Sequence, residues 1–156
     1  MSDAPAQRQL LLHKIYLKDA SVEVPKAPSV YTRPWQPQMD VQVNTGITQV
    51  NGDNWQVLLG VTVTAKLGDD VAFLIEVHQA GIFGLPGFPD GEREAVLAGH
   101  CAGVVFPYAR EAISELVQRA GFPAFLLQPI NFDAVYAEHN ARLKATQAAP
   151  ADARPH

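Results

Sequence analysis

Two pairs of side chains in this 156-residue chain have the residue types needed for catalysis or metal binding. His100 and Cys101 are adjacent and suggest a thiol nucleophile beside a general base. Neighbours in a helix point about 100° apart, however, so the helix predicted there cannot bring the two groups together, and a small buried residue is the better interpretation of Cys101. Glu76 and His78 share a predicted strand face, but one carboxylate and one imidazole are an incomplete metal-ligand set, which favours a solvated face.

The glycines and short motifs give no stronger sign of an enzyme. Gly81, Gly84 and Gly87 are spaced GxxGxxG, which lacks the dinucleotide fingerprint and indicates a flexible loop. The sequence contains no phosphate-binding loop, no HExxH and no GxSxG. Its single cysteine excludes an intrachain disulfide and a thiolate metal cluster within one chain. We expect a protein without catalytic residues, metal or cofactor; an enzyme or small-ligand protein that uses Cys101 or His78 stays open as the alternative.

The composition is typical of one globular domain. Hydrophobic residues make up 47% of the chain and charged residues 18%, and the net charge of −4 disfavours nucleic acid and anionic membranes as partners. The first residues lack the pattern of a signal peptide, and no stretch of about 18 apolar residues could span a membrane, so we expect a cytoplasmic protein that does not insert into membranes. Residues 1–9 and 142–156 have no apolar face to bury, which predicts disorder at both ends of a folded domain, residues 10–141.

Four segments in the first half of the chain alternate apolar and polar residues with period two, which predicts an antiparallel sheet. The third, over residues 55–67, is the clearest, and the fourth, over residues 71–83, carries apolar side chains on both faces. The first strand changes its apolar parity, which predicts a β-bulge near Lys18. Prolines over residues 25–37 prevent pairing and leave a long crossover, which favours a Greek-key order with strand one beside strand four.

Helical periodicity begins after the glycine- and proline-rich segment GLPGFPDG. It predicts a weak helix over residues 92–102 and a second helix with Pro107 in its first turn. Gly121 is expected to end the second helix, and Asn131 is the predicted amino-terminal cap of a last one.

Two groups of residues favour a binding function. The predicted loops carry more large apolar side chains than usual, which form either a binding groove or contacts that pin the loops to the core. These residues are Tyr31, Trp35, Phe122, Phe125, Leu126, Leu127 and Phe132. The predicted strand order also places Asp19 and Glu23 near Glu76 on the outer sheet face. Carboxylates alone are typical of a solvated surface, but with Leu74 among them they form an acidic rim around an apolar centre, which suits a basic partner segment.

Several long stretches of the sequence stand in the order IYLKDASVEVPKAP, WQPQ, VTVTAKLGDDVAFLIEVHQAGIF, FPYAREAISELVQRAGFP and LQPINFDAVY. From about Leu12 to Ala141 the chain thereby resembles the bacterial protein-export chaperone SecB. The resemblance implies an α+β fold with a four-stranded antiparallel Greek-key sheet, helices packed on one face, and a homotetramer assembled as a dimer of dimers. It implies a chaperone without enzymatic activity or cofactor, which keeps newly made precursor proteins unfolded and delivers them to the translocase motor SecA.

The resemblance also assigns roles to residues at matching positions. The SecA-docking surface corresponds to Asp19, Glu23, Leu74 and Glu76. Candidates for the client-binding groove are Tyr31, Trp35, Phe122, Phe125, Phe132 and Tyr136. The positions connected with assembly are Ile75, Val77 and Gln79 on the fourth strand and a helix stripe that includes Tyr108, Ile113 and Leu116. SecA carries zinc in its own basic tail, so no metal is implied on this chain. The segment GLPGFPDGEREAV and both ends depart from the family pattern, and a role in a toxin–antitoxin system stays open beside export.

Overall fold

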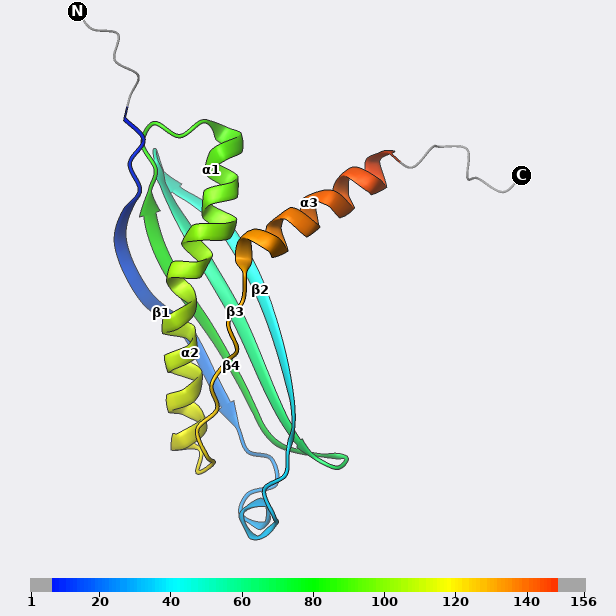
Figure 1. Ribbon diagram of the computed structural model, residues 1–156. Coiled ribbons are helices and arrows are strands. Elements are labelled where there is room, and N and C mark those ends of the chain that lie inside the picture. The colour runs from blue at the N-terminus through cyan, green and yellow to red at the C-terminus, as the bar shows by residue number, and fades with distance from the viewer. Residues whose placement is uncertain (1–6, 149–156) are drawn as a thin grey trace, which may run out of the picture.

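The computed structural model describes residues 7–148, which form one antiparallel sheet and three α-helices (Figure 1). The sheet consists of β1 (Leu11–Glu23), β2 (Gln38–Asn51), β3 (Asn54–Leu67) and β4 (Asp70–Gly84). Its strand order is β1-β4-β3-β2, and all neighbouring strands are antiparallel. The α+β class and the Greek-key order with β1 beside β4 are therefore confirmed.

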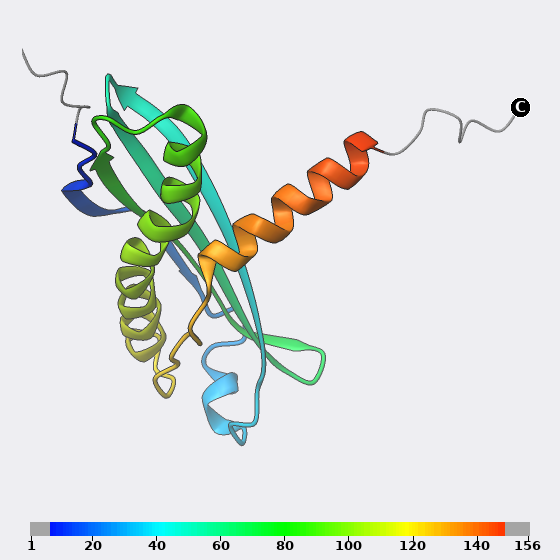
Figure 2. The same cartoon turned by 45° about the horizontal axis from the view of Figure 1, so that its top comes forward.

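Two helices cover one face of the sheet (Figure 2). α1 (Asp90–Val96) continues through a π-helical turn (Leu97–Cys101) into α2 (Ala102–Arg119), which lies over β3 and β4. An extended connector then leads to α3 (Phe132–Ala148), which points away from the sheet. The crossover between β1 and β2 contains a short 3-10 turn (Ser29–Thr32). None of the helices described between residues 7 and 148 is long and apolar enough to cross a membrane.

The hydrophobic core lies between the sheet and α2. The odd-numbered residues of β3 from Val57 to Leu67 are buried, as their period of two predicts. α2 contributes a stripe of buried residues spaced four apart, which are Val105, Ala109, Ile113 and Val117. Removal of these two apolar surfaces from water is the main stabilising contribution to this layer.

A β-bulge in β1 decides which of its side chains face the helices. The pairing of β1 with β4 shifts register between Leu17 and Asp19, which confirms the bulge predicted near Lys18. Leu17 pairs with Gln79 on the helix-covered face, whereas Asp19 pairs with His78 on the opposite face. Because side chains alternate between faces with period two, Leu17 and Asp19 would share a face without the extra residue.

Two local predictions about glycine and proline were wrong. Pro107 lies inside α2 rather than in its first turn, because burial of Phe106 and Ala109 on either side of it continues the helix despite the missing hydrogen bond. Gly81 and Gly84 belong to β4 rather than to a flexible loop. A Cβ atom at Gly81 would lie 2.8 Å from the Phe83 ring, so close packing explains this glycine.

The folded part of the chain is longer than predicted at its carboxyl end. The amide of Ala134 donates a 3.0 Å hydrogen bond to Oδ1 of Asn131, which confirms the predicted cap. From there α3 continues through residues 142–148, so the disorder predicted from Arg142 was wrong for these positions; an ion pair of 2.6 Å between Arg142 and Glu138 stabilises this part of the helix. At the amino end, the amide of Gln9 donates to the carbonyl of Pro86, which ties that residue to the loop before α1. The predicted disorder of residues 1–6 and 149–156 lies outside the described residues.

Candidate binding surfaces

An aromatic cluster joins the crossover to the end of α2. Trp35 lies 4.8 Å from Phe122 between ring centroids, and Tyr31 lies 5.3 Å from Phe122. Phe73 of the sheet completes the cluster at 5.1 Å from Phe122. The Tyr31 hydroxyl donates a 2.6 Å hydrogen bond to the carbonyl of Ala120, while the residue as a whole stays 49% exposed. Three of the predicted groove residues therefore meet at one end of the sheet, with Tyr31 on the surface.

The end of α2 explains why Phe122 turns back into this cluster. Gly121 has a φ of +92°, as predicted for the residue that ends the helix. The amide of Phe122 donates to the carbonyl of Val117, and the amide of Gly121 donates to the carbonyl of Gln118, which is the Schellman arrangement. A Cβ atom at Gly121 would also lie 3.0 Å from the Tyr31 ring. Both the backbone geometry and the close tyrosine therefore require glycine at this position.

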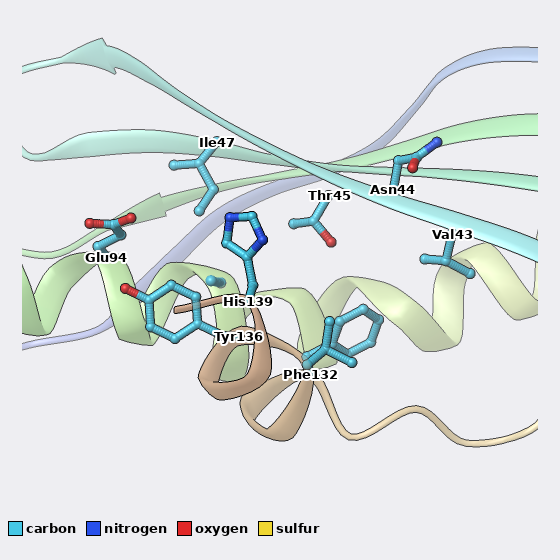
Figure 3. Close-up of a pocket in the computed structure, with 10 residues that line it drawn as sticks. Val43, Asn44, Thr45, Ile47, Glu94, Phe132, Tyr136 and His139 are labelled. Atoms are coloured by element: carbon cyan, nitrogen blue, oxygen red, sulfur yellow. The ribbon is translucent and has the colours of Figure 1, made fainter. Parts of the chain in front are cut away.

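A pocket of about 350 Å³ opens between α3 and β2 (Figure 3). Its apolar and polar walls come from three elements: β2, the helical run of α1, and the first turns of α3. Figure 3 shows His139 of α3 between Ile47 and Thr45 of β2, with the Tyr136 hydroxyl turned toward Glu94. Among residues 7–148, no strand pairs with the outer edge of β2, so the pocket lies beside backbone groups that a further strand could bond.

The remaining predicted groove residues contribute unequally to this pocket. Phe132 lines it but is buried and packs edge-on against Phe106 at 5.6 Å, so it anchors α3 to the core. Tyr136 is half-buried and forms part of the wall. Phe125 lies in the connector, half-buried against the core. The connector itself is held by Arg110, whose Nε donates a 2.8 Å hydrogen bond to the carbonyl of Leu127.

The predicted groove therefore consists of two separate contact regions, linked by the connector that runs from the aromatic cluster to α3 (Figure 1). Sequence reasoning missed the β2 side of the pocket, which is formed by Val43, Asn44, Thr45 and Ile47. The alternation of β2 was visible in the sequence. Its position at the edge of the sheet depends on the strand order, which brings β2 beside α3 only in the folded protein.

The four predicted docking residues come together on the face of the sheet opposite α2. β1 and β4 pair Ser21 with Glu76 and Glu23 with Leu74, and directly opposed residues point to the same face. Leu74 is half-buried between exposed carboxylates, as the sequence predicted. We call the four residues Asp19, Glu23, Leu74 and Glu76 the acidic face. Sequence reasoning considered His78 only as a metal ligand, yet its Nε2 lies 3.2 Å from Oε1 of Glu76 and its Nδ1 3.9 Å from Oδ2 of Asp19.

The candidate thiol and metal chemistry receives no support from the geometry. Cys101 is fully buried, and this burial raises the pKa of its thiol to about 12, so the thiolate does not form near neutral pH. His100 beside it is exposed. Within the part of the chain that the structure describes, no group of three or more histidine, cysteine, aspartate or glutamate side chains could hold a metal ion.

The residues predicted to affect assembly occupy two different environments. Ile75, Val77 and Ile113 are fully buried between the sheet and α2, and Gln79 is 5% exposed. They have little surface for a second chain. Tyr108 and Leu116, on other sides of α2, are exposed and half-buried respectively, so they are the members of this set with surface available for contact.

The structure is that of a small α+β protein, a four-stranded sheet with helices on one face. It carries two candidate binding surfaces, a pocket with apolar and polar walls at the β2 edge and an acidic face on the opposite side. The chain belongs to the SecB family, because it matches the family described as "Preprotein translocase subunit SecB" over residues 3–143. It is 45% identical over 155 residues to the "Protein-export protein SecB" of Hahella chejuensis, covering 99% of this chain and 98% of that relative. It is also 45% identical over 139 residues to the protein of the same name from Hydrogenovibrio crunogenus, covering 89% of this chain and 93% of that relative.

A solved structure of low sequence identity shares the fold. The SecB-like chaperone of Mycobacterium tuberculosis, determined in complex with an antitoxin peptide, superposes with a TM-score of 0.65 at 15% identity. The match covers 78% of this chain and 91% of that one. This match shows the shared fold, and membership of the SecB family identifies the chain as a protein-export chaperone.

Proposed function

We propose that this protein is a holdase that keeps newly made precursor proteins unfolded in the cytoplasm and delivers them to the translocase motor SecA. The observation that carries the proposal is the pocket between α3 and the free edge of β2. An unfolded chain exposes apolar side chains and unpaired backbone groups, and a pocket at a sheet edge can contact both. Membership of a protein-export family supports the same function.

The two contact regions explain how one protein can hold many different clients. Backbone hydrogen bonds to β2 do not depend on client sequence, while apolar contacts at the pocket and at Tyr31 tolerate many side chains. A client long enough to reach both regions binds more tightly, because its second contact forms within the complex that the first contact has already made. Selection then depends on folding rate, because a fast-folding client buries its own binding segments before capture.

The acidic face is the proposed docking surface for SecA. Its three carboxylates are exposed around a half-buried leucine, an arrangement that suits a basic segment with an apolar side chain. The acidic face and the core lie on opposite sides of the same sheet, and the pocket lies at the β2 edge of the helix-covered side. A client and SecA can therefore be bound at the same time, as transfer between them requires.

Assembly as a dimer of dimers is part of the proposal. β1 forms the other edge of the sheet and exposes several large apolar side chains, including Leu11, Leu12 and Leu17. Tyr108 adds an exposed aromatic ring on α2. Apolar sheet edges and patches of this kind favour association with a further chain, and burial in a homotetramer removes them from water.

The experiment that tests the holdase function mixes the purified protein with an unfolded, slow-folding precursor in the absence of nucleotide. We expect refolding to stop and a complex larger than the free chaperone to appear by light scattering. Val135→Asp, which places a charge in the pocket, is expected to weaken arrest at least tenfold, because a desolvated charge opposes apolar contact. Leu143→Asp is the matched control, since Val135 and Leu143 are similarly exposed on α3, at 53% and 47%, and only Val135 lines the pocket. Equal activity of the two variants would contradict the assignment of the pocket.

A further inference from the structure

His78 lies at the Asp19 end of the acidic face, beside Glu76, without being one of its four predicted residues. On β4 it lies directly between Asp19 of β1 and Gly60 of β3 in the register of the sheet. Its side chain is 35% exposed, so it is accessible to solvent and to a docked partner.

The neighbouring strand is shaped to hold the imidazole ring in this place. A Cβ atom at Gly60 would lie 3.2 Å from Cδ2 and 3.5 Å from Nε2 of His78. The ring therefore rests over backbone where any other residue would place a side chain. This contact holds both ring nitrogens near the carboxylates, at 3.2 Å from Glu76 and 3.9 Å from Asp19.

Carboxylates are the charged groups that face His78. Asp19 comes from β1 and Glu76 from β4 itself. The neighbouring residues on this face of β3 and β2 carry no charge. They are Gly60 and Thr62 on β3, and Asn44 and Gln42 on β2. On the same face of β1, the Tyr16 hydroxyl is hydrogen-bonded to Gln56, and Lys14 lies two residues before Tyr16. Lys18 belongs to the bulge, and among the described residues it forms no ion pair with Asp19 or Glu76.

We propose that His78 is a proton-controlled switch of the acidic face. Histidine is the side chain that most readily changes its charge within the physiological pH range. The protonated ring pairs with Glu76 and Asp19 and occupies the two carboxylates that a cationic partner needs, whereas the neutral ring leaves both available. The proposal rests on the docking of SecA proposed above. By linkage, docking in turn disfavours protonation, so SecA binding releases protons when His78 is partly protonated.

The test measures the dissociation constant of the full-length protein for purified SecA at pH 7.5 and pH 5.8, at constant ionic strength. We expect the wild type to bind about threefold to tenfold more weakly at pH 5.8, the range expected for two partly exposed ion pairs. His78→Gln keeps the polar side chain but cannot be protonated, so its affinity is expected to change much less between the two pH values. His78→Lys carries a fixed positive charge and is expected to bind weakly at both.

The outcomes separate this inference from the docking proposal. If His78→Gln loses affinity at pH 5.8 as strongly as the wild type, the switch is overturned. If Glu76→Lys abolishes SecA binding at pH 7.5 in the same series, the docking surface still stands. If SecA binds neither the wild type nor any variant, or binds Glu76→Lys as well as the wild type, both proposals fall. Arrest of client refolding by His78→Gln at both pH values verifies that the variant is folded.

Discussion

The two faces of the sheet differ in chemistry although alternate residues of the same strands build them. On β4, Ile75 and Val77 are fully buried beneath α2, while Glu76 and His78 point to the opposite, polar face. β3 shows the same contrast between buried Val61 and half-buried Thr62. No helix of residues 7–148 covers the polar face (Figure 2).

A single run of sequence can therefore specify a core and a proposed docking surface independently. The period of two sends successive side chains into environments that share almost no contacts. Substitutions on the helix-covered face should therefore change the free energy of unfolding, and substitutions on the acidic face should change binding. Three pairs of measurements test how complete that separation is.

Neighbouring residues on β4 give the largest expected contrast. Ile75→Ala leaves a cavity in the fully buried core and is expected to lower the free energy of unfolding by about 2–5 kcal/mol. Glu76→Lys lies on the exposed face and is expected to change it by less than about 0.5 kcal/mol, while abolishing SecA binding and leaving client arrest nearly intact. Urea unfolding and pull-down with SecA measure the two effects. Equal loss of client and SecA binding by Glu76→Lys would indicate a structural role for the acidic face.

Two strand glycines, one on each face, offer a finer comparison. Gly81→Ala places a methyl group 2.8 Å from Phe83 and 3.0 Å from Val105 in the core, and is expected to cost about 1–3 kcal/mol through overpacking. The nearest neighbour of the methyl group in Gly60→Ala is the His78 ring at 3.2 Å, which can move toward solvent, and Asn44 lies at an ordinary contact distance of 4.0 Å. We expect a smaller loss of stability from Gly60→Ala, together with a weaker dependence of SecA binding on pH. A larger loss from Gly60→Ala than from Gly81→Ala in urea unfolding would contradict the assignment of the faces.

The smallest expected effect is the contribution of Cys101 to the pH dependence of the free energy of unfolding. It tests burial on the helix-covered side. Burial raises the pKa of its thiol to about 12 from the ordinary 9.0, so the unfolded chain loses this proton before the folded one. The stabilisation is fully present below pH 9 and is lost as the pH rises toward 12. Between pH 8 and pH 10 the wild type is expected to lose about 1 kcal/mol more stability than Cys101→Ala. Parallel pH profiles for the two proteins would show that the thiol ionises equally in both states.

Much of the fold followed from local patterns because the responsible forces are local. Alternation marked the strands, the parity change near Lys18 marked the bulge, and the residue types at Gly121 and Asn131 marked a helix end and a helix start. Each signal depends on contacts within a few residues or on a backbone angle that few residues adopt. Pro107 was misjudged because its effect is decided by burial on both sides of it, which is a tertiary contact.

The candidate sites were harder to predict from the sequence, because they too depend on tertiary contacts. Sequence and resemblance named the acidic face, and the register of β1 on β4 brings its members together. The β2 wall of the pocket and the place of His78 over Gly60 were not predicted, because both depend on which strand lies at an edge or next to another. The alternation, the turns and the caps followed from local sterics and apolar periodicity, which the sequence carries. The chemistry that these elements bring together depends on the folded sheet, because strand order and register join residues that are far apart in the chain.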